Sequence, residues 1–228
     1  MNIKLQNQNK KAGMLFDLDG TLTDPMLGIT RCVQYALAAF DIQEPDLNKL
    51  TKFIGPPLIP AFQEFYGVDH QTAEQMLVKY RERFSTVGLY ENKVYPGIPE
   101  LLQALKDHPD RYIMALATSK PMSFAEKILE HFNLKQYFDI LSGATMDESR
   151  NTKEAVLSYA LEALRQKYPD ADAIMIGDRK FDIEAGRKAG IKTVGVLYGY
   201  GSLAEIQAAE PTHIVHTVTE LQSVLLSY

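Results

Sequence analysis

Two carboxylates follow an apolar run near the start of the chain. In the stretch MLFDLDGTLTD, Asp17 and Asp19 come directly after residues 14–16, and Gly20 and Thr21 follow them. Carboxylates placed at the end of a buried strand can ligate a hard cation or take part in proton transfer. The chemistry therefore depends on which other polar groups lie near the end of this strand.

Three later apolar runs also end on polar side chains. In open parallel sheets, ligands bind outside the carboxyl ends of the strands, so groups that follow different strands meet at one edge. We expect such an edge here. It would gather Thr118, Ser119 and Lys120 after IMALA, Lys153 in the segment after FDILSGA, and Asp178 and Asp182 after IMIG.

The charges expected at this edge require a cation. Two unit charges about 4 Å apart cost about 4 kcal/mol at an effective dielectric constant of 20, and the sequence brings four carboxylates together. All-oxygen ligands suit Mg²⁺, whereas the chain has no cluster of His and Cys that would favour zinc. A metal, Lys153, hydroxyl groups and helix N-termini together favour a phosphate ligand.

Each of these residues also fits a purely structural role. The DLDGT stretch could form a polar turn, Asp178 and Thr118 could cap helices, and Lys153 could be a solvated lysine. A calcium loop fits poorly, because its sixth and twelfth positions would be Leu22 and Gly28 where glycine and glutamate are needed. The separate structural roles leave the convergence on one sheet edge unexplained.

Apolar runs alternate with helical patterns from about Tyr112 to the C-terminal part of the chain. The expected strands lie in YIMALAT, FDILSGA, ADAIMIGD and IKTVGVL, and MLFDL adds another. Continuous apolar runs indicate strands that are covered on both faces. The fold class predicted is therefore α/β, with a mostly parallel sheet between helical layers.

The character of the sequence changes between Pro25 and about Val94. The segments ITRCVQYALAAF, PLIPAFQEFY and TAEQMLVKYRERFS have helical periodicity, with no strand-like run between them. Proline-containing stretches mark both edges. We therefore expect an α-helical insert over residues 25–94, and a discontinuous core formed by residues 1–24 and 95–228.

Composition limits the classes of function. The chain has 228 residues, 46% of them hydrophobic, a single cysteine and a formal charge of −5. One cysteine allows no internal disulfide, and no long apolar segment or secretory leader is evident, so a cytoplasmic protein without a membrane partner is expected. The scattered basic residues favour a small molecule over a nucleic-acid polymer. Oligomeric state is not indicated.

The motifs DLDGTLTD, ATSK, Lys153 and GDRKFD, in this order, resemble the four motifs of the haloacid dehalogenase-like (HAD) superfamily. The resemblance covers nearly the whole chain and is strongest to phosphoglycolate phosphatase-like members with a helical cap. It implies a Rossmann-like parallel sheet core and a Mg²⁺-dependent phosphatase that acts on a small phosphomonoester through an aspartyl-phosphate intermediate.

The resemblance also implies roles for individual residues. Asp17 would be the nucleophile, and Asp19 would be the general acid and then the general base. Thr118, Ser119 and Lys153 would hold the phosphoryl group, together with the turn at Gly20 and Thr21. The metal would be held by Asp17, by Asp19 through its backbone carbonyl, and by Asp178 and Asp182.

The identity of the phosphate ester stays open at this point. An aspartate at position 19 favours phosphate esters over the halide and ion-pump branches of the family, and the GDRKFD motif favours hydrolysis over a sugar-phosphate mutase. Two substrates remain: phosphoglycolate and a nucleoside monophosphate, the latter as for a 5′-nucleotidase. Substrate contacts are expected from the insert, with Lys52 in the loop TKFIGPPL as the candidate, although Lys52 could equally be solvated. A non-catalytic phosphate-binding module is the alternative from another class, and it predicts the loss of Asp17 or Asp19.

Overall fold

The computed structural model describes residues 10–147 and 149–228, and it divides into two compact units. The core unit combines the segment that ends at Leu22 with Tyr95–Tyr228, and the cap unit is Thr23–Val94. The division lies two residues before the Pro25 boundary expected from the sequence. The first nine residues, which the sequence analysis assigned to the core, lie outside the described residues.

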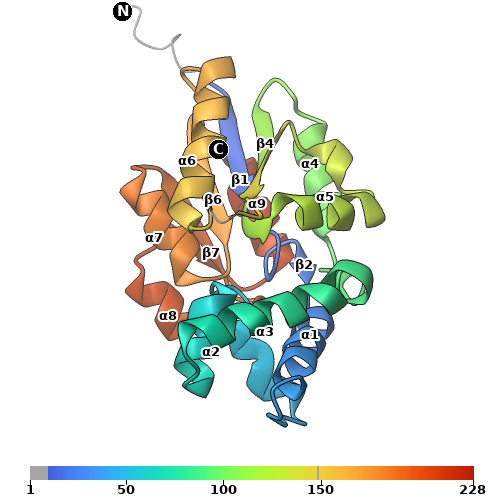
Figure 1. Ribbon diagram of the computed structural model, residues 1–228. Helices are drawn as coiled ribbons and strands as arrows, with labels where there is room; N and C mark the ends of the chain where they lie inside the picture. The colour runs from blue at the N-terminus through green and yellow to red at the C-terminus, as the bar shows by residue number, and fades with distance from the viewer. Residues whose placement is uncertain (1–9, 148) are drawn as a thin grey trace, which may run out of the picture. The chain divides into compact units, whose positions relative to one another are not determined.

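A six-stranded parallel sheet forms the centre of the core unit (Figure 1), which confirms the predicted fold class. The strand order is β5-β4-β1-β6-β7-β8. The strands are β1 (Ala12–Phe16), β4 (Tyr112–Pro121), β5 (Ile140–Ala144), β6 (Asp172–Gly177), β7 (Lys192–Val196) and β8 (His213–Val215).

Helices cover both faces of this sheet. The helices of the core unit are α4 (Ile98–Lys106), α5 (Met122–His131), α6 (Lys153–Lys167), α7 (Lys180–Lys188), α8 (Leu203–Ala208) and α9 (Val218–Leu226). A short 3₁₀ helix, η3 (Lys135–Tyr137), precedes β5. In Figure 1, α6 and α7 lie on one side of β1 and β4, and α4 and α5 lie on the other. The sequence analysis did not identify α4, β8 and α9. The strand β8 has only three residues, which is too short for an apolar pattern to be evident.

The hydrophobic core of this unit lies between β1, β4, β6 and the helix α6. Leu15, Ala115 and Met175 come from adjacent strands and pack with Leu157 and Leu161 of α6, all of them buried. Because side chains alternate across a strand, Met14 and Phe16 are buried on the opposite face. Strands buried on both faces explain the continuous apolar runs in the sequence.

The cap unit is mostly helical. It contains β2 (Thr23–Asp24), α1 (Met26–Ala38), the 3₁₀ helix η1 (Leu47–Phe53), α2 (Leu58–Tyr66), α3 (His70–Arg83), the π-helical turn η2 (Phe84–Gly88) and β3 (Lys93–Val94). The two short strands pair antiparallel with each other. The segment around Lys52, expected as a loop, belongs in part to η1, which Asp46 caps by accepting a hydrogen bond from the N–H of Asn48.

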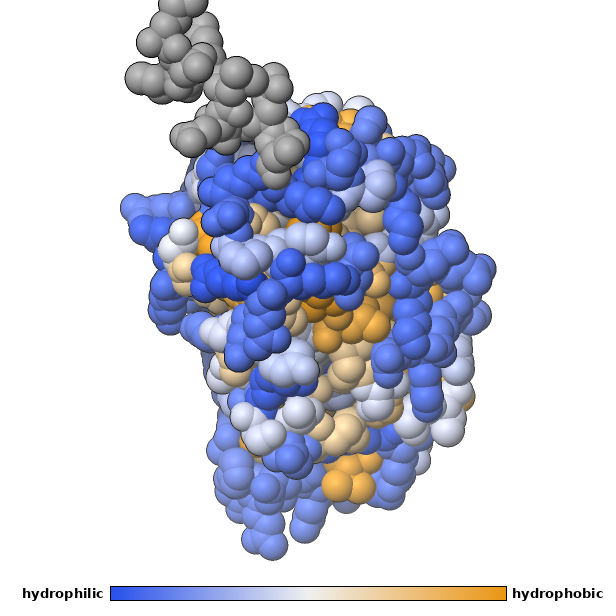
Figure 2. All heavy atoms as spheres, turned by 90° about the horizontal axis from the view of Figure 1, so that it is seen from above, coloured by the Kyte–Doolittle hydropathy of each residue, from blue (hydrophilic) through white to orange (hydrophobic). Residues whose placement is uncertain are grey.

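Hydrophilic residues predominate on the face of the molecule in Figure 2, where hydrophobic residues gather mainly near the centre. Within residues 10–147 and 149–228, no helix is both long enough and apolar enough to cross a membrane.

Candidate active site

The register of the three central strands brings the predicted residues together. Phe16 lies beside Leu116 of β4 and beside Ile176 of β6. The N–H of Asp17 donates to the carbonyl of Ile176 at 2.9 Å. Asp17 therefore lies at the same edge of the sheet as Thr118 near the end of β4 and Asp178 just after β6.

Lys153 lies between two carboxylates at this edge. Its Nζ is 2.8 Å from Oδ1 of Asp17 and 2.8 Å from Oδ1 of Asp182, and it donates to the carbonyl of Ala117 at 3.1 Å. Lys153 is the first residue of α6, and the hydroxyl of Thr152 caps this helix. The helix start thus positions the ammonium group, and all three charged side chains are buried.

Asp178 and Asp182 belong to the segment that connects β6 to α7. Oδ2 of Asp182 accepts a hydrogen bond from the N–H of Arg179 at 3.1 Å, which closes the first turn of the helix. Oδ2 of Asp178 accepts from the N–H of Tyr200 at 2.8 Å. Asp182 is thus oriented through both of its oxygens, one by Lys153 and one by the Arg179 N–H, whereas Asp178 is oriented through Oδ2 by the loop after β7.

The turn after Asp19 is tight because of Gly20. Gly20 has φ +83°, a conformation that side chains disfavour, and a Cβ at this position would collide with the carboxylate of Asp178. The neighbouring Thr21 is buried, and its Oγ1 has no hydrogen-bond partner among the described residues. The glycine therefore allows the first motif to approach the fourth closely.

A second, partly buried ion pair holds Asp19. Nζ of Lys120 lies 2.5 Å from Oδ2 of Asp19, and the side chains are 6% and 14% exposed. The N–H of Lys120 also donates to Oγ1 of Thr118 at 3.2 Å. The sequence analysis placed Lys120 at this edge but assigned it no role. The signal was its place at the carboxyl end of β4, two residues after Thr118.

Burial and mutual repulsion shift the acidities of these carboxylates. Burial raises the pKa of Asp178 well above its usual range, and the charges of Asp182 and Asp17 add to the effect. Burial raises the pKa of Asp182 to about 6, against the opposing effect of Lys153. Burial likewise raises the pKa of Asp19, although Lys120 opposes it. The raised pKa values indicate that the negative charges of these carboxylates exceed the positive charges around them.

Lys153 remains charged despite its burial. Burial alone would lower the pKa of its ammonium group, but the facing carboxylates of Asp17 and Asp182 outweigh that effect and raise the pKa. The four carboxylates are matched by two ammonium groups, those of Lys120 and Lys153. The formal charge left over is −2, which one divalent cation would neutralise.

Three of the carboxylates could hold such a cation. Asp17, Asp178 and Asp182 are buried, and each offers an oxygen within 4.8 Å of the oxygens of the other two. Oδ1 of Asp178 is buried and accepts no hydrogen bond from the described residues, an arrangement that costs free energy unless a cation or water contacts it. An all-oxygen, carboxylate-rich set fits a hard metal ion.

The remaining predicted site residues lie in different places. Thr118 is buried next to the carboxylates, whereas Ser119 is partly exposed. Lys52 belongs to the cap unit and is not among the residues that the core unit brings together. Its Nζ lies 4.3 Å from the centre of the Phe65 ring and 5.5 Å from that of Tyr66.

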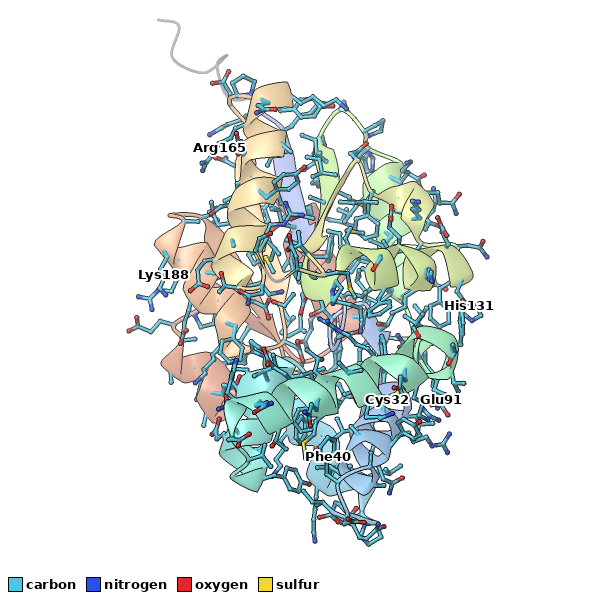
Figure 3. The ribbon with its side chains drawn as sticks, in the orientation of Figure 1. Cys32, Phe40, Glu91, His131, Arg165 and Lys188 are labelled. Atoms are coloured by element: carbon cyan, nitrogen blue, oxygen red, sulfur yellow. The ribbon has the colours of Figure 1, made fainter. Side chains whose placement is uncertain are left out.

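Other polar side chains of the core helices project away from this cluster. Figure 3 shows His131 at the end of α5, Arg165 on α6 and Lys188 on α7, each directed outward. All three are exposed. The buried charged groups at the strand ends therefore differ from these exposed side chains, which point away from the site.

The chain is similar in sequence to known proteins. It is 44% identical over 215 residues to a 5′-nucleotidase of Pseudomonas aeruginosa, covering 94% of this chain and 96% of the relative. It is 36% identical over 214 residues to the tyrosine-protein kinase PtkA of Mycobacterium tuberculosis (93% and 72%). It is 33% identical over 191 residues to a phosphoglycolate phosphatase of Aquifex aeolicus (83% and 86%).

A solved structure agrees with these relatives. A predicted phosphatase from Clostridium acetobutylicum superposes with a TM-score of 0.89 at 45% identity, covering 96% of this chain and all of that one. The model of the haloacid dehalogenase-like hydrolases matches residues 14–196, which include the carboxylates and Lys153. The chain therefore belongs to the haloacid dehalogenase-like hydrolase family, within which its relatives and structural neighbours make it a phosphoric monoester hydrolase.

Proposed function

We propose that the protein is a Mg²⁺-dependent phosphatase that hydrolyses a small phosphomonoester through an aspartyl-phosphate intermediate on Asp17. The observation that carries the proposal is the arrangement of Lys153 between Asp17 and Asp182, 2.8 Å from each, beside the buried carboxylate of Asp178. Such a site combines a nucleophile, a fixed cation and ligands for a metal, which are the parts that phosphoryl transfer needs.

Asp17, Asp178 and Asp182 would hold the metal ion, together with the backbone carbonyl of Asp19. Bound there, Mg²⁺ would neutralise charge on the phosphoryl oxygens. The oxygen donors and the formal charge of −2 favour Mg²⁺, which usually binds through one or two carboxylates and a substrate phosphate.

The residues of the chain divide the remaining work. One carboxylate oxygen of Asp17 attacks phosphorus, and Asp19 gives a proton to the leaving alcohol and later takes one from the attacking water. Lys153 binds phosphoryl oxygens and holds Asp17 in place. Oγ1 of Thr118 accepts a hydrogen bond from a backbone N–H, so its own proton can point to a phosphoryl oxygen. Ser119 and the turn at Gly20 and Thr21 would add donors.

The core unit would carry this chemistry, and the cap unit would choose the substrate. We assign residues 1–24 and 95–228 to the catalytic core and residues 25–94 to the cap. A lid of this kind can exclude water and supply contacts to the leaving group. Lys52, held over Phe65 and Tyr66, is the cap residue that we propose to contact substrate.

Nucleoside 5′-monophosphates are the first candidate substrates, because the 44% identical relative from P. aeruginosa is a 5′-nucleotidase. The partly exposed rings of Phe65 and Tyr66, which pack against the buried ring of Phe53 in the cap unit, suit a nucleobase. Phosphoglycolate is the second candidate. It is favoured by the relative from A. aeolicus and by the cationic side chain of Lys52.

A phosphate-release assay over a panel of monophosphates, with Mg²⁺ and with a chelator, tests the reaction and ranks the substrates. We expect release that depends on Mg²⁺. Asp17→Asn should abolish turnover while the circular dichroism spectrum and melting temperature remain close to those of the wild type. Full activity of Asp17→Asn would contradict the mechanism, and a sugar phosphate that is isomerised without phosphate release would indicate a mutase.

A further inference from the structure

We propose that Lys120 is a positioning residue that orients the carboxylate of Asp19 for proton transfer to the leaving group. The inference rests on the proposed function and adds to it a residue with no assigned part in the reaction. It concerns one oxygen atom: Lys120 holds Oδ2 of Asp19, and this leaves Oδ1 to carry the proton.

The contact between the two side chains is short and buried. Nζ of Lys120 lies 2.5 Å from Oδ2 of Asp19, and the side chains are only 6% and 14% exposed. Oδ1 of Asp19 is buried and accepts no hydrogen bond within the part of the chain that the structure describes. A carboxylate held through one oxygen keeps a defined rotamer, with its other oxygen available for chemistry.

The backbone places Lys120 for this contact. The pairing of β4 with β5 shifts register between Thr118 and Pro121 of β4, so the strand departs from regular geometry over the stretch that contains Lys120. The N–H of Lys120 donates to Oγ1 of Thr118, which fixes this end of the strand. The same segment thus positions the Thr118 hydroxyl and the Lys120 ammonium on one side of the site.

The two buried lysines contact different carboxylates. Lys153 pairs with Asp17 and Asp182, whereas Lys120 pairs with Asp19. Lys153 makes no ion pair with Asp19, so the described contacts leave Asp19 to Lys120. The separate pairing suggests that Lys153 serves the nucleophile and Lys120 serves the acid/base.

Asp19 gives a proton in the first step of the reaction and takes one in the second. In the first step an oxygen of Asp17 bonds to phosphorus, the phosphorus–oxygen bond to the alcohol breaks, and the proton on Asp19 passes to the departing oxygen, which keeps the bonding electron pair. In the second step water oxygen bonds to phosphorus, its proton passes to Asp19, and the bond between phosphorus and Asp17 breaks. Lys120 exchanges no proton in either step.

The test compares two esters with different leaving groups. An alkyl phosphate, the best of the panel, needs a proton on its departing oxygen, whereas p-nitrophenyl phosphate releases a stable phenolate that does not. The value of kcat/KM reports the steps up to departure of the leaving group. In Lys120→Met we expect kcat/KM for the alkyl ester to fall about 100-fold, the lower end of the usual contribution of general acid catalysis, and that for the nitrophenyl ester to fall at least tenfold less.

The ratio of the two kcat/KM values is the informative quantity, because partial unfolding of the variant changes both values by the same factor. Lys120→Arg, which can still bind Oδ2, should restore most of the wild-type ratio. Lys127→Met, a change at an exposed lysine of the following helix α5, should leave both values unchanged.

The outcomes separate the inference from the proposed function. If the wild type hydrolyses both esters and Asp17→Asn hydrolyses neither, the proposed function stands. An equal loss for both esters in Lys120→Met, or no loss, then overturns the positioning role. Release of no phosphate by the wild type from any ester overturns the proposed function, and the inference falls with it.

Discussion

Gly20 contacts the carboxylate of Asp178 so closely that no other residue fits at its position. The two residues come from different motifs, one following β1 and the other following β6, and a Cβ on Gly20 would overlap the Asp178 side chain. The loop after β7 holds Asp178 from another direction, through the N–H of Tyr200. The candidate metal ligand is therefore positioned by two backbone segments.

Gly20→Ala should lower the free energy of unfolding by about 2 kcal/mol or more and weaken the response to Mg²⁺. The φ of +83° alone costs a side chain about 1–2 kcal/mol, and the collision with Asp178 adds to this cost. Urea unfolding measures the stability, and Mg²⁺ titration of activity measures the displacement of Asp178.

Gly190→Ala is the matched control for that change. Gly190 has φ +70°, and a Cβ there would meet no atom within 4 Å. We expect a loss from backbone strain of about 1–2 kcal/mol with the Mg²⁺ titration unchanged. Equal effects of the two substitutions on the Mg²⁺ titration would show that the contact between Gly20 and Asp178 does not position a metal ligand.

Lys153→Met should remove activity and destabilise the metal-free protein by about 3–5 kcal/mol, because it leaves Asp17 and Asp182 buried with their counter-charge lost. The double variant Lys153→Met with Asp182→Asn removes one of these charges and should recover part of the stability but none of the activity. Thermal unfolding in a chelating buffer, together with the phosphate-release assay, measures both quantities.

Lys188→Met provides the comparison for Lys153→Met. Lys188 pairs with Glu154 at the same distance of 2.8 Å, but its side chain is 67% exposed. Exposed pairs of this kind contribute about 0–1 kcal/mol, so we expect a small change in stability and full activity. Similar losses in the two lysine variants would contradict the role that burial has in this argument.

The metal-free protein should lose stability as the pH rises from about 4 to about 6. The pKa of Asp182 is raised from 3.8 in the unfolded chain to about 6 in the folded one, and burial also raises that of Asp178. A folded-state pKa above the unfolded value means that the native state binds the proton more tightly. The stabilisation is complete below the unfolded pKa and is lost as pH rises through the folded pKa, about 3 kcal/mol for Asp182.

Mg²⁺ should reverse this loss, because a cation at these oxygens favours the ionised carboxylates. We expect the rise in melting temperature on adding Mg²⁺ to a chelator-treated sample to be several degrees at pH 7.5 and much smaller at pH 5. The difference between the two samples at one pH cancels the titration of all other groups. An equal rise at the two pH values would exclude competition between metal and protons at this site.

Much of the core could be predicted because its strands are buried on both faces. Continuous apolar runs such as IMALA and IMIG identify strands, and in a parallel sheet their carboxyl ends share one edge, so Asp17, Thr118 and Asp178 could be grouped without coordinates. The helix start at Lys153 could also be predicted, from the βα pattern. The short β8 could not, since a three-residue strand carries no pattern. The helices α4 and α9 were missed although their sequences carry the signal, since Ile98, Leu101, Leu102 and Leu105 of α4 recur at helical spacing and are buried.

Which charged groups pair with one another could be seen only in the tertiary structure. The sequence by itself determined the family and the parallel core, because the motifs and the continuous apolar runs follow from residue types and their spacing, and it predicted a helical insert and a set of groups at one sheet edge. Only the tertiary structure decided that Lys120 pairs with Asp19 while Lys153 pairs with Asp17 and Asp182, and that Tyr200 holds Asp178. The contact between Lys120 and Asp19 joins residues 101 positions apart along the chain, and it depends on distances of a few ångströms that no local pattern encodes.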